Sequence, residues 1–90
     1  MATTMFIRHR VSDFGLWRRV YQEVAPMQRA GGVIAEAVYQ GEGDPNDVTV
    51  THEFASPEAA QEFMESTDLK AAMDRAGVLG APTIWITERT

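Results

Sequence analysis

Apolar and polar side chains alternate with a period of two along four stretches of the chain, which is the pattern of β-strands that bury one face. The pattern predicts strands over residues 4–11, 33–40 and 48–55, and a final strand over residues 83–87. Between the second and third strands, residues 43–47 (Gly-Asp-Pro-Asn-Asp) have the composition of a tight turn, in which the proline presets its own φ angle. The second and third strands are therefore predicted to form a hairpin.

The segment between the first two strands carries apolar residues at helical spacing. Asp13 is a suitable N-cap for this helix, because its carboxylate can accept a hydrogen bond from the first turn. Pro26 interrupts the hydrogen-bond ladder of the helix, and Gly31-Gly32 end it. Its buried stripe would consist of Trp17, Val20, Tyr21 and Val24.

A second helical region is predicted after the third strand. It begins at residues 56–58 (Ser-Pro-Glu), which combine a capping hydroxyl, a proline suited to the first turn and an acidic residue near the helix N-terminus. Residues 67–68 (Thr-Asp) predict a second helix start, and Gly77 ends that helix. The apolar stripes of the two helices would be formed by Ala60, Phe63, Met64, Leu69, Ala72, Met73 and Ala76.

The elements follow the order β-α-β-β-α-β, which predicts an α+β fold: one ferredoxin-like domain over residues 1–90 with a four-stranded antiparallel sheet. Right-handed crossovers place the first and third strands side by side at the sheet centre. One face of the sheet would meet the helices, and the other is expected to be of mixed character. That second face would carry Phe6, Ile34, Val38 and Trp85 among Arg8, Arg10, Glu36 and Glu53. Such a face favours a homodimer that forms through the sheets.

Composition narrows the class of protein further. The chain has 90 residues, 44% of them hydrophobic, and no cysteine, which excludes disulfides and thiolate chemistry. Its N-terminal sequence lacks the apolar run of a signal peptide, and no stretch approaches the ~20 apolar residues of a membrane span. A cytoplasmic protein without a membrane partner is therefore expected. A formal net charge of −5, without a stripe of basic residues, argues against nucleic acid as a partner.

The two histidines are the candidate catalytic residues. His9 and His52 fall on the helix-facing side of the two central strands, and a matching register would bring their Cβ atoms to about 5 Å from each other. Two imidazoles beside an apolar cavity suit general acid–base chemistry near neutral pH. The alternative is that both are core residues bonded to backbone carbonyls. No metal site is expected, because two imidazoles need a third ligand and the nearby Glu53 and Glu36 are predicted to point to the opposite face.

Aromatic and methionine side chains are the candidate substrate-binding residues. Trp17 and Tyr21 are four positions apart on the first helix and would face the sheet, where they could stack on a planar ligand, although large aromatic residues are more often ordinary core. Tyr39 could line the mouth of the cavity or an interface. Met64 and Met73 lie on helix faces where flexible thioethers can shape an adaptable pocket wall.

Four segments together resemble a known family: residues 7–17 (Ile-Arg-His-Arg-Val-x-Asp-Phe-x-x-Trp), 25–27 (Ala-Pro-Met), 44–48 (Asp-Pro-Asn-Asp-Val) and 72–78 (Ala-Met-x-x-Ala-Gly-Val). The set resembles the antibiotic biosynthesis monooxygenase-like (ABM) branch of the dimeric α/β-barrel superfamily, several members of which are described as polyketide cyclases. The resemblance implies two sheets that form one eight-stranded barrel across a dimer, and a ligand cavity between sheet and helices in each subunit. Relatives carry out cofactor-free oxygenation of aromatic polyketides, cyclisation, isomerisation and haem degradation.

Cyclisation or isomerisation is the preferred reaction. The oxygenating and haem-degrading relatives typically place an asparagine beside a tryptophan in the pocket, whereas the single asparagine here, Asn46, falls in the predicted turn. We therefore expect a cofactor-independent enzyme of secondary metabolism that acts on a hydrophobic aromatic or polyketide substrate and uses no cofactor. A cofactor-free monooxygenase of the ABM type is one alternative. A non-catalytic dimer that binds a small hydrophobic metabolite is another.

Overall fold

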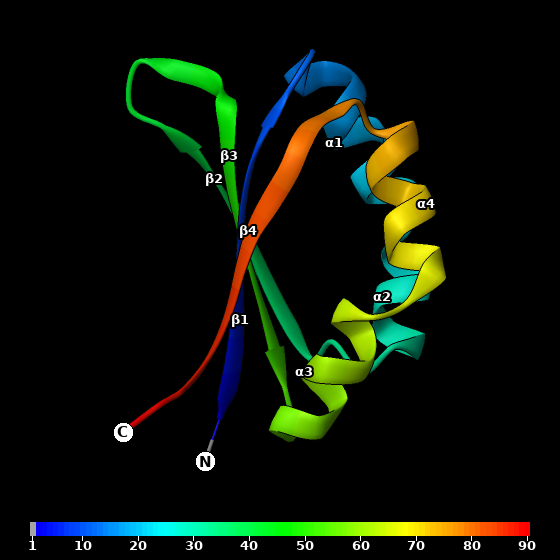
Figure 1. Ribbon diagram of the computed structural model, residues 1–90, viewed down its shortest axis with the longest axis vertical. Helices are drawn as coiled ribbons and strands as arrows, with labels where there is room; N and C mark the ends of the chain where they lie inside the picture. The colour runs from blue at the N-terminus through cyan, green and yellow to red at the C-terminus, as the bar shows by residue number, and fades with distance from the viewer. Residues whose placement is uncertain (1) are drawn as a thin grey trace.

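The computed structural model describes residues 2–90, which build one antiparallel sheet with all the helices on one of its faces (Figure 1). In chain order the elements are β1 (Thr3–Val11), α1 (Phe14–Glu23), α2 (Ala25–Ala30), β2 (Ala35–Gly41), β3 (Asp44–Phe54), α3 (Pro57–Met64), α4 (Thr67–Arg75) and β4 (Val78–Glu88). The strand order is β2-β3-β1-β4, and all neighbours pair antiparallel. The predicted α+β ferredoxin-like arrangement, with the first and third strands at the centre, is confirmed. No helix among residues 2–90 has the length and apolar character to cross a membrane.

Capping side chains determine where the helices begin. The Asp13 carboxylate accepts a hydrogen bond from the Leu16 amide at 3.1 Å, and the Ser56 hydroxyl accepts one from the Ala59 amide at 3.2 Å, both as predicted. The start of α4 was predicted one residue too late. Its cap is Ser66, whose hydroxyl accepts hydrogen bonds from the amides at the N-terminus of α4, rather than the Thr-Asp pair that follows it.

The β2–β3 hairpin is tighter than predicted, because its turn consists of Glu42 and Gly43 alone. Gly43 has a φ angle of +75°, which glycine adopts without steric cost. Residues 44–47, predicted as turn, belong to β3 instead. Pro45 is accommodated there because the β2–β3 register shifts between Gln40 and Gly41, so the proline, which has no amide proton, leaves no ladder bond broken.

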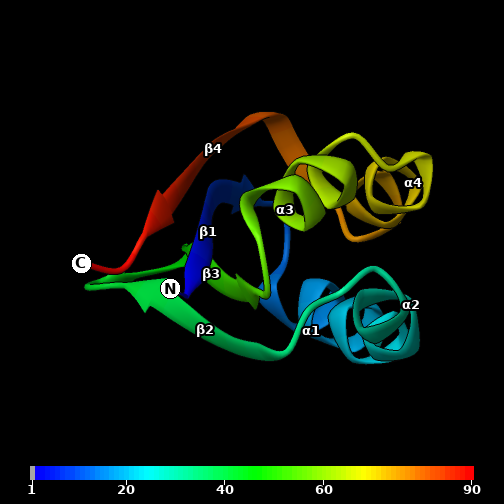
Figure 2. The same ribbon diagram turned by 90° about the horizontal axis from the view of Figure 1, so that it is seen from below.

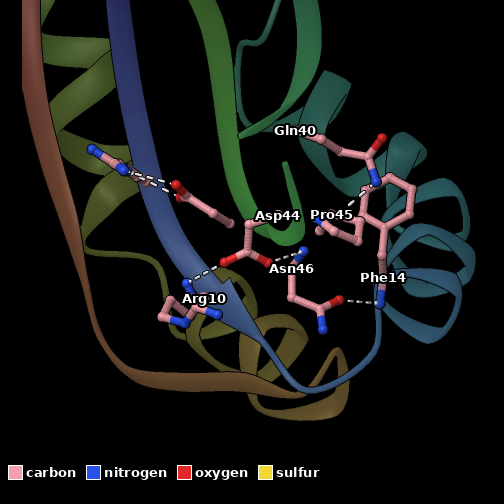
Figure 3. A network of polar contacts seen from close by, with 8 residues as sticks. Arg10, Phe14, Gln40, Asp44, Pro45 and Asn46 are labelled. Atoms are coloured by element: carbon pink, nitrogen blue, oxygen red, sulfur yellow. Dashed lines mark hydrogen bonds and ion pairs between the residues drawn. The ribbon is translucent and has the colours of Figure 1, made fainter. Parts of the chain in front are cut away.

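Polar contacts tie the turn end of this hairpin to β1 and to the helical layer (Figure 3). The Asp44 carboxylate accepts hydrogen bonds from the Asn46 amide at 3.1 Å and from the Arg10 guanidinium at 2.7 Å. The Asn46 side-chain oxygen in turn accepts a hydrogen bond from the Phe14 amide, 3.2 Å away in the first turn of α1. Asn46 is therefore a structural tether between β3 and α1.

β4 begins at Val78, five residues before its predicted start. The strand predicted from the sequence begins only after Pro82, because proline usually interrupts a strand. In the structure β4 is an edge strand, and its register with β1 shifts between Arg8 and Arg10. The proline falls within this irregular stretch, where no ladder partner is required. Gly80, with a φ angle of +71°, allows the backbone to bend there.

The core lies between the sheet and two helical arms, α1–α2 and α3–α4, which sit side by side on the same face of the sheet (Figure 2). The buried faces of β1 and β3 supply Met5, Ile7, Val11, Val48, Val50 and Phe54. Against them pack Trp17, Val20, Ala60, Phe63 and Leu69 from the helices.

The outer face of the sheet differs from the predicted one in its β2 residues. Glu36 is paired with His52 and Val38 with Val50, and directly opposed residues point to the same side, so Glu36 and Val38 face the helices. Ile34 lies outside β2 and lines a groove beside α1 and α2. The strand itself is ambiguous, because neither of its faces is clearly apolar and only the pairing register decides which one turns inward.

Candidate functional site

A small apolar cavity lies between the inner face of the two central strands and helices α1, α2 and α4. Its volume is about 40 Å³, which is room for a few water molecules. Aliphatic side chains make up about half of the wall: Ile7, Val20, Val24, Val50, Leu69, Ala72 and Ala76. Both histidines also line this cavity.

Aromatic rings form a continuous stack along one side of the cavity. Trp17 and Tyr21 are stacked with ring centroids 4.8 Å apart and planes 17° from parallel. The ring of His9 meets Trp17 edge-on at 5.8 Å, and that of His52 lies nearly parallel to Tyr21 at 6.2 Å. Each imidazole therefore stands at one end of the Trp17–Tyr21 stack, and the predicted stripe on the first helix is what places the two aromatic rings there.

The register does not align the two histidines, contrary to the arrangement that we considered from the sequence. His9 is opposite Val48, whereas His52 is opposite Met5, so the two positions are offset by four residues along the paired strands. At about 3.3 Å per residue this offset is about 13 Å. The imidazoles consequently share one cavity without contacting each other.

His9 is buried and has no polar partner. Its side chain is 7% exposed, and neither ring nitrogen has a hydrogen-bond partner within the described part of the chain. Burial disfavours the charged imidazolium and lowers the pKa of His9 below its usual value of 6.5. The ring is therefore mostly neutral at pH 7.

His52 is more deeply buried and is anchored at one nitrogen. Its side chain is 1% exposed, and its Nε2 atom lies 3.2 Å from the hydroxyl oxygen of Tyr21. The other nitrogen, Nδ1, is buried without a partner among residues 2–90. Burial lowers the pKa of His52 to about 4, and the nearby Glu36 carboxylate opposes this effect weakly.

Glu36 completes this arrangement from the edge of the sheet. Its carboxylate accepts a hydrogen bond of 2.6 Å from the Tyr21 hydroxyl. Burial, together with this bond to the carboxylate, holds the pKa of Tyr21 far above its usual value, so the phenol keeps its proton; the Gln28 amide acts in the opposite direction. Tyr21 thus links a buried imidazole to an exposed carboxylate.

Three of the five predicted substrate-binding residues line the cavity, namely Trp17, Tyr21 and Met73. Met64 is half-buried against the core away from the cavity wall. Tyr39, predicted at the mouth of the cavity or in an interface, does not line the cavity: it pairs with Thr49 on the outer face of the sheet and is 57% exposed, so the interface remains a prediction.

Two residues of the site, Gln28 and Glu36, were not predicted from the sequence. Gln28 is buried on α2 and lines the cavity. It follows Tyr21 by seven positions and so continues the apolar stripe of α1, a signal that the break at Pro26 obscured. Glu36 was assigned to the wrong face. It lies on the same face of the sheet as His52. Even so, no three histidine or carboxylate side chains among residues 2–90 lie close enough together to hold a metal ion.

Several solved structures are similar to this chain over almost their full length. A protein from Bordetella bronchiseptica described as an antibiotic biosynthesis monooxygenase has a TM-score of 0.84 at 10% identity, with 99% of this chain and 97% of that one covered. The chain has the fold of the antibiotic biosynthesis monooxygenases. SnoaB, a cofactor-independent oxygenase from Streptomyces nogalater, has a TM-score of 0.75 at 11% identity, with coverages of 99% and 95%. A conserved protein from Methanosarcina mazei reaches 0.79 at 15% identity, with coverages of 100% and 94%.

Neither a protein-family model nor a curated protein matches the sequence. At identities of 10 to 15%, the similarity to the solved structures establishes the ABM-like fold. The resemblance inferred from the four sequence segments is confirmed at this level.

Proposed function

We propose that this protein is a cofactor-independent enzyme of secondary metabolism that moves a proton on a hydrophobic, polyketide-like aromatic substrate and so promotes its cyclisation or isomerisation. The observation that carries the proposal is the placement of His52. Its Nε2 atom is anchored to Tyr21, its Nδ1 atom is buried without a partner among residues 2–90, and the residue lines an apolar cavity. A neutral imidazole with a free lone pair, shielded from water, is suited to act as a general base.

The remaining cavity residues fit a flat substrate. Trp17 and Tyr21 offer stacked aromatic faces, and the aliphatic wall excludes water from the reacting atoms. The two ring nitrogens of His9, at the far end of the stack, have no partner within residues 2–90, so a polar group of the substrate could engage them. A cavity of about 40 Å³ is smaller than a fused-ring molecule, so the cavity must widen for such a substrate to bind. The flexible Met73 side chain on α4 is well suited to such adjustment.

Cofactor-free oxygenation is the second candidate, and Gln28 is the observation that favours it. The family resemblance predicts an amide beside a tryptophan in the pocket, and Asn46 cannot supply it, because it tethers α1 outside the cavity. Gln28 is a buried amide that lines the same cavity as Trp17. SnoaB, which has the same fold, is a cofactor-independent oxygenase. Both candidate reactions begin with removal of a proton from the substrate by a base.

Deuterium exchange tests the shared first step. Anthrone and benzoylacetone, two aromatic ketones with acidic C–H groups, are incubated with the protein in D2O under argon, and loss of the C–H signal is followed by NMR. We expect exchange that is faster than in buffer and saturates with substrate. In air, the oxygenase would consume one O2 per molecule of anthrone, whereas a cyclase or isomerase would consume none. Binding without faster exchange of either probe would instead favour the non-catalytic binder.

A second copy of the chain is the proposed partner of the outer sheet face. Phe6 and Trp85 are stacked there with ring centroids 5.2 Å apart, and Trp85 and Tyr39 remain largely exposed in the single chain. Covering this face in a dimer would bury apolar area. An obligate interface of this kind typically buries about 2,000 Å² or more.

Light scattering checks the dimer. We expect a particle of about 20 kDa, twice the 10.0 kDa chain, at micromolar concentration. Trp85→Glu should shift it to the monomer, because it buries an unpaired charge in the interface. Gln61→Glu adds the same charge on an exposed position of α3 and should leave the dimer intact. A wild-type protein that scatters as a monomer would exclude this partner.

A further inference from the structure

We infer that Glu36 is a positioning residue: acting through Tyr21, it holds His52 in the tautomer that carries its proton on Nε2 and leaves a free lone pair on Nδ1. The directions of the Tyr21–Glu36 and Tyr21–His52 hydrogen bonds carry this assignment. Its catalytic consequence rests on the function proposed above, in which His52 is the base.

The direction of the bonds follows from the number of protons available. A phenol hydroxyl has one proton to donate, and an ionised carboxylate can only accept. The 2.6 Å contact between the Tyr21 and Glu36 oxygens therefore uses the Tyr21 proton, since the two oxygens would otherwise oppose their lone pairs at that distance. The Tyr21 oxygen is then left as an acceptor. Its 3.2 Å contact with His52 requires a proton on Nε2.

The surroundings of Nδ1 agree with this direction. A neutral imidazole has one N–H group, so a proton on Nε2 leaves Nδ1 as an acceptor. Nδ1 is buried and has no partner in the part of the chain that the structure describes. Burial of an unpaired N–H donor is rarer in proteins than burial of an unpaired acceptor. The opposite tautomer would leave such a donor at Nδ1 and would also break the contact with Tyr21.

The hydrogen-bonded series His52–Tyr21–Glu36 would also stabilise the positive charge that forms when His52 takes up a proton. The imidazolium would face Tyr21 from α1 and, through it, the Glu36 carboxylate from β2, and the ring that it meets from α3 is the uncharged Phe63. The carboxylate favours the charged ring. A carboxylate that orients an imidazole through its second nitrogen is a recurring device in catalysis. Here a tyrosine hydroxyl is inserted between the two groups.

Nitrogen NMR on the full chain reads the tautomer directly. The protein is labelled with ¹⁵N at histidine, and the His52 signals are assigned by their loss in His52→Gln. We expect the wild-type His52 ring to be protonated at Nε2. In Glu36→Ala the Tyr21 hydroxyl has lost its acceptor and should donate to Nε2, which moves the ring proton to Nδ1. In Glu36→Gln the amide oxygen can still accept, so the wild-type tautomer should persist without the charge.

Glu42→Gln is the matched control, because it removes the same charge from the exposed turn at the other end of β2 and should leave His52 unchanged. A wild-type ring protonated at Nδ1, or an unchanged ring in Glu36→Ala, would overturn the assignment. For exchange on anthrone, we expect Glu36→Ala to lower kcat by about 10–100-fold with KM little changed, and Glu36→Gln to recover much of that loss. A tautomer that responds as expected in a protein without any exchange activity would support the role of Glu36 and refute the proposed function.

Discussion

Replacement of His52 by Gln is expected to slow C–H exchange on anthrone by about 10²–10⁴-fold. The amide keeps roughly the volume of the ring and can hydrogen-bond to Tyr21, but it cannot take up a proton. The loss should appear in kcat more than in KM, because the aromatic stack that would bind the substrate is retained. The rates are measured by NMR in D2O under argon, at saturating and at low anthrone concentration.

His9→Gln is the matched variant, since it makes the same change at the other end of the cavity. Neither ring nitrogen of His9 has a hydrogen-bond partner among residues 2–90 that would set its tautomer, so a smaller loss is expected there. Exchange within a few-fold of wild type in both variants, together with lower melting temperatures, would mean that the two histidines serve only the packing of the core. The double variant would then behave in the same way.

The free energy of unfolding is expected to fall by about 2 kcal/mol between pH 7 and pH 5 on account of His52 alone. In the folded protein the pKa of His52 is about 4, whereas it is 6.5 in the unfolded chain. Between these values the unfolded chain binds a proton that the folded protein excludes, so stability is fully present above pH 6.5 and is lost as the pH falls toward 4. The lowered pKa of His9 adds to the effect in the same direction.

Urea unfolding at pH 7 and pH 5 measures this change. His52→Gln removes the titrating group, so its stability should vary less with pH than that of the wild type, by about 2 kcal/mol over this interval. The lowered pKa values of Asp44 and Asp47 act below pH 4 and do not enter the comparison. Equal pH dependence in the two proteins would show that His52 is not held neutral by burial.

The sequence alone determined those features that depend on neighbouring residues. Strand alternation located β1 and assigned His9 to its inner face, and the spacing of Trp17 and Tyr21 placed both rings toward the sheet. Asp13 and Ser56 marked helix starts because a capping hydrogen bond spans only three residues. Element order then limited the sheet to one topology, since crossover connections have a preferred hand.

Strand boundaries near proline were decided by the sheet instead. Pro45 and Pro82 predict interruption of a strand, yet both lie within strands in the structure. Pro45 is tolerated because the pairing of β3 with β2 shifts register beside it, and Pro82 because the pairing of β4 with β1 does so. No local sequence pattern reveals these shifts. The edge position of β4 is likewise a property of the assembled sheet.

The site itself depended on tertiary structure at two points. His9 and His52 each have the correct face from alternation, but their separation depends on how β1 and β3 are paired. Glu36 has a face only once β2 is paired with β3, because the alternation in β2 is too weak to favour one side. The link from Glu36 through Tyr21 to His52 joins residues up to 31 positions apart. Local sequence patterns specify which way a side chain points along its own element, whereas long-range pairing specifies which side chains meet.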